Sequence, residues 1–415
     1  MKSLKLLLAV LVLLCLCACA GAEEIWTATD LTPATEDMPL AEDITQQVLI
    51  NGEMDKAYLN EMRDGNYRTY WESYKYTENP GLSITPPDGK AVGGLLIKWR
   101  LMTNIKTFVQ VRNSEGEWVT IAEGDDEFVA QYYPLPGLTE EFRVVSQNDP
   151  REVLQICEIE VYTTGRLSPD VQVWQSAPEK VDLLQIVAHP DDELLWFGGL
   201  LPTYAGEEKK DVLVAVSSYR IYHRKFELLD GLWHAGVRYH PIFLHLTDAQ
   251  DRDMYGVLKL WGENHAKQVV STLLRKYKPD VLVLQDEKGE YGHPVHRAIT
   301  YVSKKAVPLA ADAAYDPESA LRYGLWDVPK VYIHLYKENQ IQMDWKKPLS
   351  AFDGKTGLEV ATEAVRKHVT QQGHWDVWDG GKWDNSLFGL WHTTVGVDEV
   401  GGDMFEHIDK LYAED

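Results

Sequence analysis

The sequence predicts an α/β protein in which a mostly parallel sheet carries helices on both faces and follows an all-β sandwich domain. The chain has 415 residues, which suggests two or three domains at roughly 150 residues each. Hydrophobic residues make up 45% and charged residues 25%, the usual balance of a globular protein with a core. Near residue 165 the hydrophobic pattern changes from short alternating segments to apolar strands separated by helical stretches.

Residues 1–22 are typical of a signal peptide. Two lysines form a basic start, and Leu6–Leu16 is an apolar run too short to span a membrane comfortably. The motif Leu-Cys-Ala-Cys at 16–19 resembles a bacterial lipobox, in which the last cysteine, Cys19, is lipidated. The small residues there would also serve an ordinary signal peptidase. We therefore expect an exported, extracytoplasmic protein, either lipid-anchored to the bacterial surface or released by signal cleavage.

Charge limits the classes of partner. Residues 23–44 carry seven acidic residues, no lysine or arginine, and two prolines, which is typical of a solvated tether. The formal net charge of the chain is −23. Binding of nucleic acid needs a basic face, and docking on anionic lipid needs a polybasic patch. The charge argues against both, so we expect membrane contact only through the N-terminal anchor.

Residues 45–164 show short alternating strands between clusters of Gly, Pro, Asn and Asp, the pattern of an antiparallel sandwich. Cys157 alternates with Ile159 and Val161, so we expect it in the core as a small hydrophobe. Residues 165–180, with two prolines, are expected to form an inter-domain linker. The clearest strands are Gly94–Trp99, Thr107–Arg112, Trp118–Ala122 and Phe142–Ser146.

In residues 181–415 apolar strands alternate with helical stretches, which predicts a Rossmann-like sheet with helices on both faces. The clearest helix runs over Val257–Tyr277. In such sheets ligands bind outside the carboxyl ends of the strands. The predicted strands are Leu183–Ala188, Val212–Ser217, Pro241–His245, Val281–Gln285 and Lys330–Tyr336.

Two polar clusters follow the first and fourth of these strands. One is His-Pro-Asp-Asp-Glu at 189–193, and the other contains Tyr-Gly-His-Pro-Val-His at 291–296. Two imidazoles and one carboxylate with an open fourth position make a catalytic zinc site. His293 and His296 are three residues apart, so a helix beginning there places both on one face, and one can bind metal while the other contacts substrate. Each motif alone is a common turn, but the pair at one sheet edge predicts a metal site.

These motifs resemble the GlcNAc-phosphatidylinositol deacetylase (PIG-L or LmbE-like) family. The likeness covers about Val181 to Ala310 and includes Ala188–Glu193 with the following pair of glycines. Arg224–Glu227 is similar to the family's Arg-x-x-Glu element, and His368–Gln371 to a later His-x-x-Gln element. Members are mostly zinc-dependent hydrolases of N-acetyl groups on glucosamine-containing compounds, and some cleave other amides.

The resemblance implies a metal site and a base. His189, Asp192 and His296 would hold one catalytic Zn²⁺, or another divalent metal, and Asp191 would be the general base beside it. An amide needs a strong nucleophile, and Zn²⁺ lowers the pKa of a bound water from about 15.7 to about 7.

The resemblance also implies roles around the metal. His293 would orient the substrate or stabilise charge in the transition state, and Tyr291 would polarise the carbonyl. Glu193 is expected to support the loop. Arg224 could bind substrate, with a buried ion pair to Glu227 as an equally supported alternative.

Other polar residues are expected to be structural. Asp248, Asp251 and Asp253 follow the third strand, where a solvated loop is favoured over contacts with substrate hydroxyls. His265 lies four residues after Trp261, which predicts a core histidine. Packing is also favoured over sugar stacking for the tail tryptophans, namely Trp375, Trp378, Trp383 and Trp391.

Residues 64–71 and the strand Ile156–Tyr162 resemble a discoidin-like (coagulation-factor type C) domain over 45–164. Such domains are jelly-roll sandwiches that often bind carbohydrate. The first segment typically lies inside that fold, so its aromatic residues are weak candidates for sugar contacts. These candidates are Tyr67, Tyr70 and Trp71 in the segment, with Tyr74 and Tyr76 just after it.

Together these features predict an extracytoplasmic zinc N-deacetylase acting on an N-acetylated saccharide, with an appended glycan-binding module. One alternative is a non-catalytic, glycan-binding surface lipoprotein, which the filled metal and base positions disfavour. A second is an amidase on another amide. A third is a glycosidase using Asp191, which needs two opposed carboxyl groups roughly 5 to 9.5 Å apart.

Overall fold

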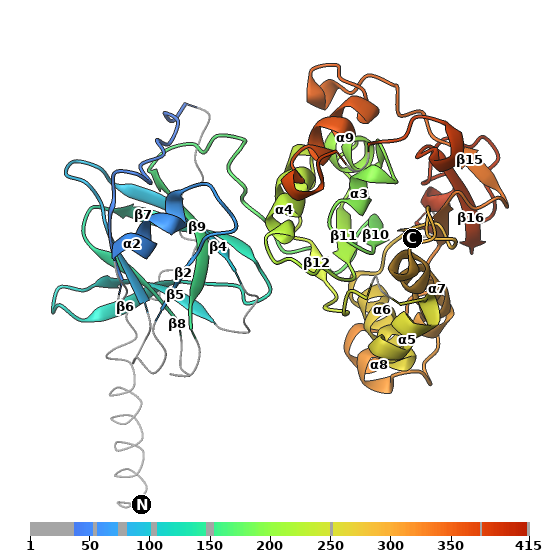
Figure 1. Ribbon diagram of the computed structural model, residues 1–415, viewed down its shortest axis with the longest axis horizontal. Helices are drawn as coiled ribbons and strands as arrows, with labels where there is room; N and C mark the ends of the chain where they lie inside the picture. Colours follow the sequence, from blue (N-terminus) through green and yellow to red (C-terminus); the bar gives the residue numbers. More distant parts are fainter. Residues whose placement is uncertain are drawn as a thin grey trace, which may run out of the picture. The chain divides into compact units, whose positions relative to one another are not determined.

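The computed structural model describes residues 37–52, 56–73, 81–100, 106–146, 153–249, 252–373 and 376–412. The chain forms two compact units that divide between Gln172 and Val173 (Figure 1). The predicted signal peptide with Cys19, and the tether up to residue 36, lie outside the described residues. Within the described ranges, no helix is both long and apolar enough to cross a bilayer.

The N-terminal unit is an antiparallel sandwich of two sheets. One sheet has five strands in the order β1-β3-β8-β5-β6, and the other has four in the order β2-β9-β4-β7. A short helix, α2 (Lys56–Leu59), and a 3₁₀ turn, Asn60–Arg63, follow the first strand. The strands are β1 (Leu49–Gly52), β2 (Trp71–Glu72), β3 (Gly81–Thr85), β4 (Val92–Trp99), β5 (Thr107–Arg112), β6 (Trp118–Glu123), β7 (Ala130–Leu138), β8 (Phe142–Ser146) and β9 (Gln155–Thr163).

Alternation along these strands builds the core of the sandwich. Val109 and Phe142 from one sheet and Ile97 from the other are fully buried in one cluster. Each inward residue is followed by one that faces outward, since side chains alternate along a strand. Cys157 is fully buried in β9, as its alternating neighbours predict, and Trp71 is also fully buried. The predicted all-β sandwich is therefore present.

The C-terminal unit contains the predicted α/β sheet. Its order is β12-β11-β10-β13-β14-β16-β15, and the first five strands run parallel, whereas β16 is antiparallel to both neighbours. The strands are β10 (Leu183–Val187), β11 (Val212–Val216), β12 (Ile242–Phe243), β13 (Val281–Leu284), β14 (Lys330–His334), β15 (Gln340–Gln342) and β16 (Leu387–Thr393). The helices are α3 (Asp192–Leu195), α4 (Arg224–His234), α5 (Met254–Trp261), α6 (Glu263–Tyr277), α7 (Pro294–Ala310), α8 (Pro317–Tyr323) and α9 (Gly357–Val365).

Helices cover both faces of this sheet, with α5, α6 and α7 on one side and α3, α4 and α9 on the other (Figure 1). On the first side, Leu184 and Ile186 of β10 share a buried cluster with Leu274 of α6 and Ile299 of α7. Their neighbours along β10 are also buried, so the strand is apolar on both faces. The strand order reverses between β10 and β13, so the crevice beyond their carboxyl ends is the expected ligand position.

One predicted helix is wrong in detail. The expected continuous helix over Val257–Tyr277 is two helices, because α5 ends and α6 begins at Gly262. Gly262 has a φ of +68°, a left-handed conformation that glycine adopts at little cost and that interrupts a helix. The apolar spacing continues across the break, which is why the pattern alone did not show it.

The stretch predicted as a linker is partly packed against the C-terminal unit. The Trp174 ring lies edge-on to Trp233 with 5.2 Å between centroids. The backbone N–H of Gln175 donates to the carbonyl of Arg238, and that of His240 donates to the carbonyl of Gln175. The segment after Val173 thus contributes contacts that a fragment beginning later would lose.

We expect a fragment of residues 173–415 to fold alone and to unfold at a higher temperature than a fragment of residues 181–415. The shorter fragment exposes the Trp233 face and loses two backbone hydrogen bonds. Circular dichroism melts of the two fragments compare them directly. Equal melting temperatures would show that the 173–180 segment adds nothing, and failure of both to fold would mean that the units share a core.

Candidate active site

The backbone of the loop after β10 is constrained at its first carboxylates, Asp191 and Asp192. Asp191 has a φ of 116°, which a residue with a side chain rarely adopts. Its N–H donates to Oε2 of Glu193 at 2.8 Å. Strained residues of this kind persist only where surrounding contacts fix them, and they cluster at functional sites. The local chain is therefore held so that Asp191 and Asp192 present separate carboxylates.

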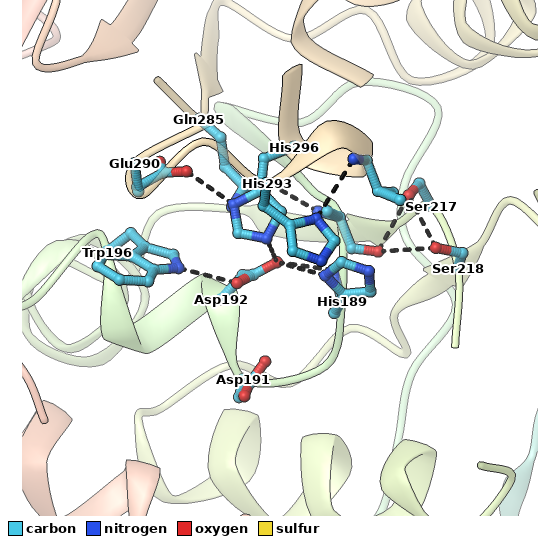
Figure 2. A network of polar contacts seen from close by, with 12 residues as sticks. His189, Asp191, Asp192, Trp196, Ser217, Ser218, Gln285, Glu290, His293 and His296 are labelled. Carbon is cyan, nitrogen blue, oxygen red and sulfur yellow. Dashed lines mark hydrogen bonds and ion pairs between the residues drawn. The ribbon is translucent and has the colours of Figure 1, made fainter. Parts of the chain in front are cut away.

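The Asp192 carboxylate lies between two imidazoles (Figure 2). Its Oδ2 accepts a hydrogen bond from the backbone N–H of His189 and lies 3.3 Å from Nδ1 of His189 and 3.4 Å from Nε2 of His296. Its Oδ1 accepts from the indole N–H of Trp196 at 2.8 Å. Burial raises the pKa of Asp192, but His296 and His189 outweigh this and hold the pKa below its usual range. Asp192 is therefore anionic.

Three imidazoles gather at this point, from the loop after β10 and from the start of α7. One nitrogen from each of His189, His293 and His296 lies within 4.8 Å of the others. The Nε2 atoms of His189 and His296 are buried and make no hydrogen bond with any described residue. Buried nitrogen atoms without a hydrogen bond, beside an anionic carboxylate, suit a divalent metal ion. The residues present therefore fit a metal site.

A carboxylate from the third strand's loop completes one side of the cluster. Oδ1 of Asp248 lies 3.4 Å from Nε2 of His189, and the Asp248 side chain is only 2% exposed. Burial lowers the pKa of His189, but Asp192 and Asp248 raise it to about 9. The expectation of a solvated loop is thus wrong for Asp248, because the chain after β12 turns back onto the sheet edge. The two carboxylates favour a positive charge here, which a metal cation would supply.

The other two acidic residues after the third predicted strand, Asp251 and Asp253, are not placed in the cluster. Asp253 caps α5 by accepting from the N–H of Gly256 at 2.8 Å, and Asp251 lies outside the described residues. His265, predicted in the core, is exposed on α6. The break at Gly262 rotates this part of the helix relative to α5 and accounts for the error.

His296 is fixed from behind by a carboxylate of its own loop. Its Nδ1 lies 2.7 Å from Oε2 of Glu290 and 3.0 Å from Nε2 of Gln285. Glu290 also accepts from the backbone N–H of Asp286 and contacts His334 at 3.3 Å. Burial raises the pKa of Glu290, but its bonds with His296 and His334 lower it overall. With its Nδ1 proton donated to Glu290, His296 directs the Nε2 lone pair into the cluster.

We expect Glu290→Gln to weaken metal affinity or activity by about 10- to 100-fold, the range for residues that orient a metal ligand. The amide keeps the shape but removes the charge that fixes the His296 tautomer. Glu287→Gln is the matched control, because Glu287 is an exposed carboxylate in the same loop that pairs with Lys304. Metal titrations of both variants give the comparison, and equal affinities would contradict the role of Glu290.

Arg224 at the start of α4 lies against the predicted base. Its Nη2 is 2.9 Å from Oδ1 of Asp191 and also donates to the carbonyl of Pro190. Among the described residues no ion pair joins Arg224 to Glu227, so that alternative is wrong. Glu227 instead accepts from the backbone and hydroxyl of Thr370, at 3.1 and 2.6 Å. Substrate binding by Arg224 stays a prediction, and its visible contact is with Asp191.

The later His-x-x-Gln element reaches the same loop. Nε2 of His368 lies 3.0 Å from Oε1 of Glu193, and both side chains are fully buried. The other oxygen of Glu193 is the one that accepts from Asp191. Glu193 therefore connects the C-terminal part of the chain to the strained backbone of Asp191.

Tyr291 lies at the edge of the cluster and is 43% exposed. Its ring centroid is 5.6 Å from those of both His293 and His296. Burial and the charges of Asp192 and Asp191 raise its pKa, so the hydroxyl keeps its proton. It is placed to donate a hydrogen bond beside the histidines.

The tail tryptophans pack around this loop. The indole N–H of Trp383 donates to the carbonyl of Glu290 at 3.0 Å, and its ring lies 4.9 Å from that of Trp378. Trp391 packs against the core cluster of the sheet. Trp375 lies outside the described residues. The visible contacts of these rings are structural.

Residues 184–307 match the family model described as PIG-L, GlcNAc-PI de-N-acetylase. One curated relative is 1D-myo-inositol 2-acetamido-2-deoxy-alpha-D-glucopyranoside deacetylase 1 from Catenulispora acidiphila. It is 30% identical over 178 residues, covering 36% of this chain and 54% of the relative. The chain thus spans about half the length of that relative.

Two solved structures show likeness to separate parts of the chain. N,N'-diacetylchitobiose deacetylase from Pyrococcus horikoshii is 19% identical, with a TM-score of 0.36, covering 46% of this chain and 71% of that one. The family 32 CBM (carbohydrate-binding module) of C. perfringens NanJ, in complex with galactose, is 19% identical, with a TM-score of 0.24, covering 29% and 98%.

The match to the family model contains both loops that build the cluster. His189 to Glu193, Arg224, and Glu290 to His296 all fall between residues 184 and 307. The same segment contains β10, β13 and the start of α7, which bring those loops together. Residues 184–307 therefore form a domain of the GlcNAc-PI de-N-acetylase (PIG-L) family.

Proposed function

We propose that this protein is an exported, metal-dependent N-deacetylase that removes the acetyl group from an N-acetylglucosamine-containing glycan or glycoconjugate. The observation that carries the proposal is the buried cluster of His189, His296 and Asp192 beside a separately held Asp191. The cluster lies at the carboxyl edge of β10 and β13, where α/β sheets bind ligands. The signal-like N-terminus supports a location outside the cytoplasm.

His189, Asp192 and His296 would hold one divalent ion. Two imidazoles and a carboxylate with an open position are typical ligands of catalytic zinc. When bound, such an ion lowers the pKa of water from about 15.7 to about 7 and polarises a carbonyl. His293 is the remaining imidazole of the cluster, and its Nδ1 already accepts from the N–H of Val295 at 3.3 Å.

Asp191 is the group that accepts a proton from the attacking water. Burial raises its pKa to about 7, and the Arg224 guanidinium opposes this rise. A base whose pKa lies near the working pH transfers protons efficiently in both directions. The contact with Arg224 also fixes which way the carboxylate points.

Two neighbouring groups stabilise the charge that develops on the amide oxygen. Burial and the charges of His296 and His189 lower the pKa of His293 to about 3, so its imidazole is neutral. Tyr291 keeps its hydroxyl proton. Donors that are already in place where charge develops are a large source of rate acceleration.

A glycosidase is less well supported by the same geometry. A glycosidase needs two opposed carboxyl groups, but Asp191 and Asp192 are neighbours in one loop, and Asp192 is engaged by Trp196 and two histidines. A glycosidase also leaves the buried nitrogen atoms of His189 and His296 without a role.

Acetate release from a panel of N-acetylated saccharides tests the proposal. The panel contains N-acetylglucosamine, N,N'-diacetylchitobiose, an inositol glycoside of N-acetylglucosamine, and the same sugars with N-propionyl groups. We expect acetate from at least one N-acetylglucosamine compound, loss of release with a chelator, and recovery on adding Zn²⁺. Release of reducing sugar without acetate would favour the glycosidase, and binding without release of any product would favour a glycan-binding protein.

A further inference from the structure

A groove in the N-terminal unit is lined by charged side chains. It encloses about 380 Å³ and runs over the five-stranded sheet from β1 to β6. Its polar lining consists of Asn51, Ser83, Arg112, Trp118, Glu141 and Arg143. Five strands at about 4.8 Å spacing make the sheet roughly 19 Å wide, enough for a short chain of sugar rings.

The strand register places the two arginines on one face. Arg143 in β8 pairs with Gln110 in β5, and Arg112, two residues further along β5, pairs with Trp118 in β6. Residues two apart in a strand point the same way. Both guanidinium carbons lie close to the Trp118 ring centroid, Arg112 at 4.3 Å and Arg143 at 4.4 Å. The three side chains therefore form one surface.

Hydrogen bonds fix the arginines but leave most of their donors available. Nε of Arg143 donates to Oε1 of Gln110 at 2.9 Å, and Nη1 of Arg112 donates to the carbonyl of Gly116 at 2.8 Å. Their other N–H groups make no hydrogen bond with residues that the structure describes. Each side chain is thus held in place with part of its guanidinium fork open.

Within the described part of the chain, no ion pair neutralises these two arginines. Neither Arg112 nor Arg143 forms an ion pair with a described carboxylate, and Glu141 is the one acidic residue that lines the groove. Burial and the charge of Arg112 lower the pKa of Arg143, and the charge of Glu141 opposes this lowering. An anion bound between the two arginines would reduce their mutual repulsion.

We propose that this groove binds an acidic glycan, with the carboxylate of a uronic acid residue held between Arg112 and Arg143 and a sugar ring beside Trp118. Guanidinium forks match carboxylates in shape and bond them bidentately. The Trp118 ring backs both guanidinium groups, and Asn51 and Ser83 offer groups for sugar hydroxyls. This site lies in the N-terminal unit and goes beyond the deacetylation proposed above.

Calorimetric titration of the whole chain tests this site, with a galacturonic acid tetramer and its methyl-esterified form as probes. The ester keeps the sugar rings but removes the charge. We expect the acid to bind and the ester to bind about tenfold more weakly or not at all, since hydrogen bonds to charged groups are stronger than bonds to neutral ones. Affinity for the acid should fall with added salt.

Variants assign the binding to the groove. The double variant Arg112→Gln and Arg143→Gln should lose tetramer affinity by about tenfold or more, and the double Lys variant should retain part of it. Trp118→Ala should weaken both probes, and Trp118→Phe should retain more affinity. Lys106→Gln is the matched control, because Lys106 is an exposed cation just before β5 and outside the groove. Melting temperatures identify any variant that unfolds.

Three outcomes would overturn the proposal: equal affinity for acid and ester, equal loss in Lys106→Gln, or binding of a poly-glutamate peptide as tight as that of the tetramer. The last would indicate an acidic protein partner. None of these measurements involves acetate release, so failure here is separate from failure of the deacetylase proposal.

Discussion

Replacing Asp191 with asparagine is expected to lower turnover by about 10²–10⁴-fold while the metal content stays at the wild-type level. That loss is the usual contribution of a general acid–base group, and the asparagine side chain has nearly the same volume. Asp191 contacts Arg224 rather than the histidine cluster, so its substitution leaves the three proposed ligands unchanged. Kinetics and metal analysis on the same preparation measure both effects.

The pH dependence of activity gives a second test of the Asp191→Asn variant. A base must be unprotonated to act, so activity rises as pH increases through the pKa of Asp191. Burial raises that pKa to about 7 in the metal-free protein, and a nearby cation would lower it, so the acid limb should lie at or below about pH 7. The limb should disappear in Asp191→Asn. It should remain in His293→Ala, which separates the carboxylate from the imidazole.

Asp192→Asn is the matched control, because it makes the same chemical change one residue away. Asp192 faces His189 and His296 and is anionic, so a neutral amide there should weaken metal binding. If Asp191→Asn loses the metal and Asp192→Asn keeps it, the two roles are exchanged and the proposed assignment is wrong.

His296→Ala is expected to remove most of the bound metal and nearly all activity. Nε2 of His296 is one of the buried nitrogen atoms that make no hydrogen bond with the described residues, and Glu290 orients it by accepting the proton of the other ring nitrogen. Its removal leaves a two-ligand site, which binds a divalent ion weakly. Metal content after dialysis measures the loss. Full occupancy in this variant would contradict the ligand assignment.

Two further substitutions sharpen this experiment. His265→Ala is the same change at an exposed histidine of α6 and should alter neither metal content nor activity. His293→Ala separates two ligand sets, because His293 belongs to the three-histidine cluster but not to the proposed set with Asp192. We expect His293→Ala to keep the metal and to lower turnover. Loss of metal in that variant would favour a three-histidine site.

The sheet of the C-terminal unit could be predicted because its strands are buried on both faces. Leu183–Val187 and Val212–Val216 are continuous apolar runs, and such runs between helical stretches have few other interpretations. The antiparallel pair β15 and β16 could not be predicted. Gln340–Gln342 is only three residues long, and Leu387–Thr393 mixes glycine and polar residues with aromatic ones. Their pairing depends on β14, the last parallel strand of the sheet, whose outer edge pairs with β16.

The sequence predicted those residues of the candidate site that lie directly after the ends of strands. The loops after β10 and β13 meet because the two strands are neighbours, so His189 and His296 follow from topology alone. The residues that hold them could not be found in this way. Asp248 reaches the cluster through a turn after a two-residue strand, and His368 meets Glu193 across 175 positions of sequence. Such contacts depend on how loops pack, and loop packing leaves no periodic pattern of apolar residues in the sequence.

A titration of activity against metal occupancy tests whether this chain is a metal-dependent N-deacetylase. The purified chain is stripped with a chelator, and zinc is then added back in steps while acetate release from an N-acetylglucosamine saccharide and bound metal are measured together. We predict no activity in the stripped protein and a linear rise that ends at one metal ion per chain. Full acetate release from the stripped protein, or occupancy of the site without any release, would show that the protein is not a metal-dependent N-deacetylase.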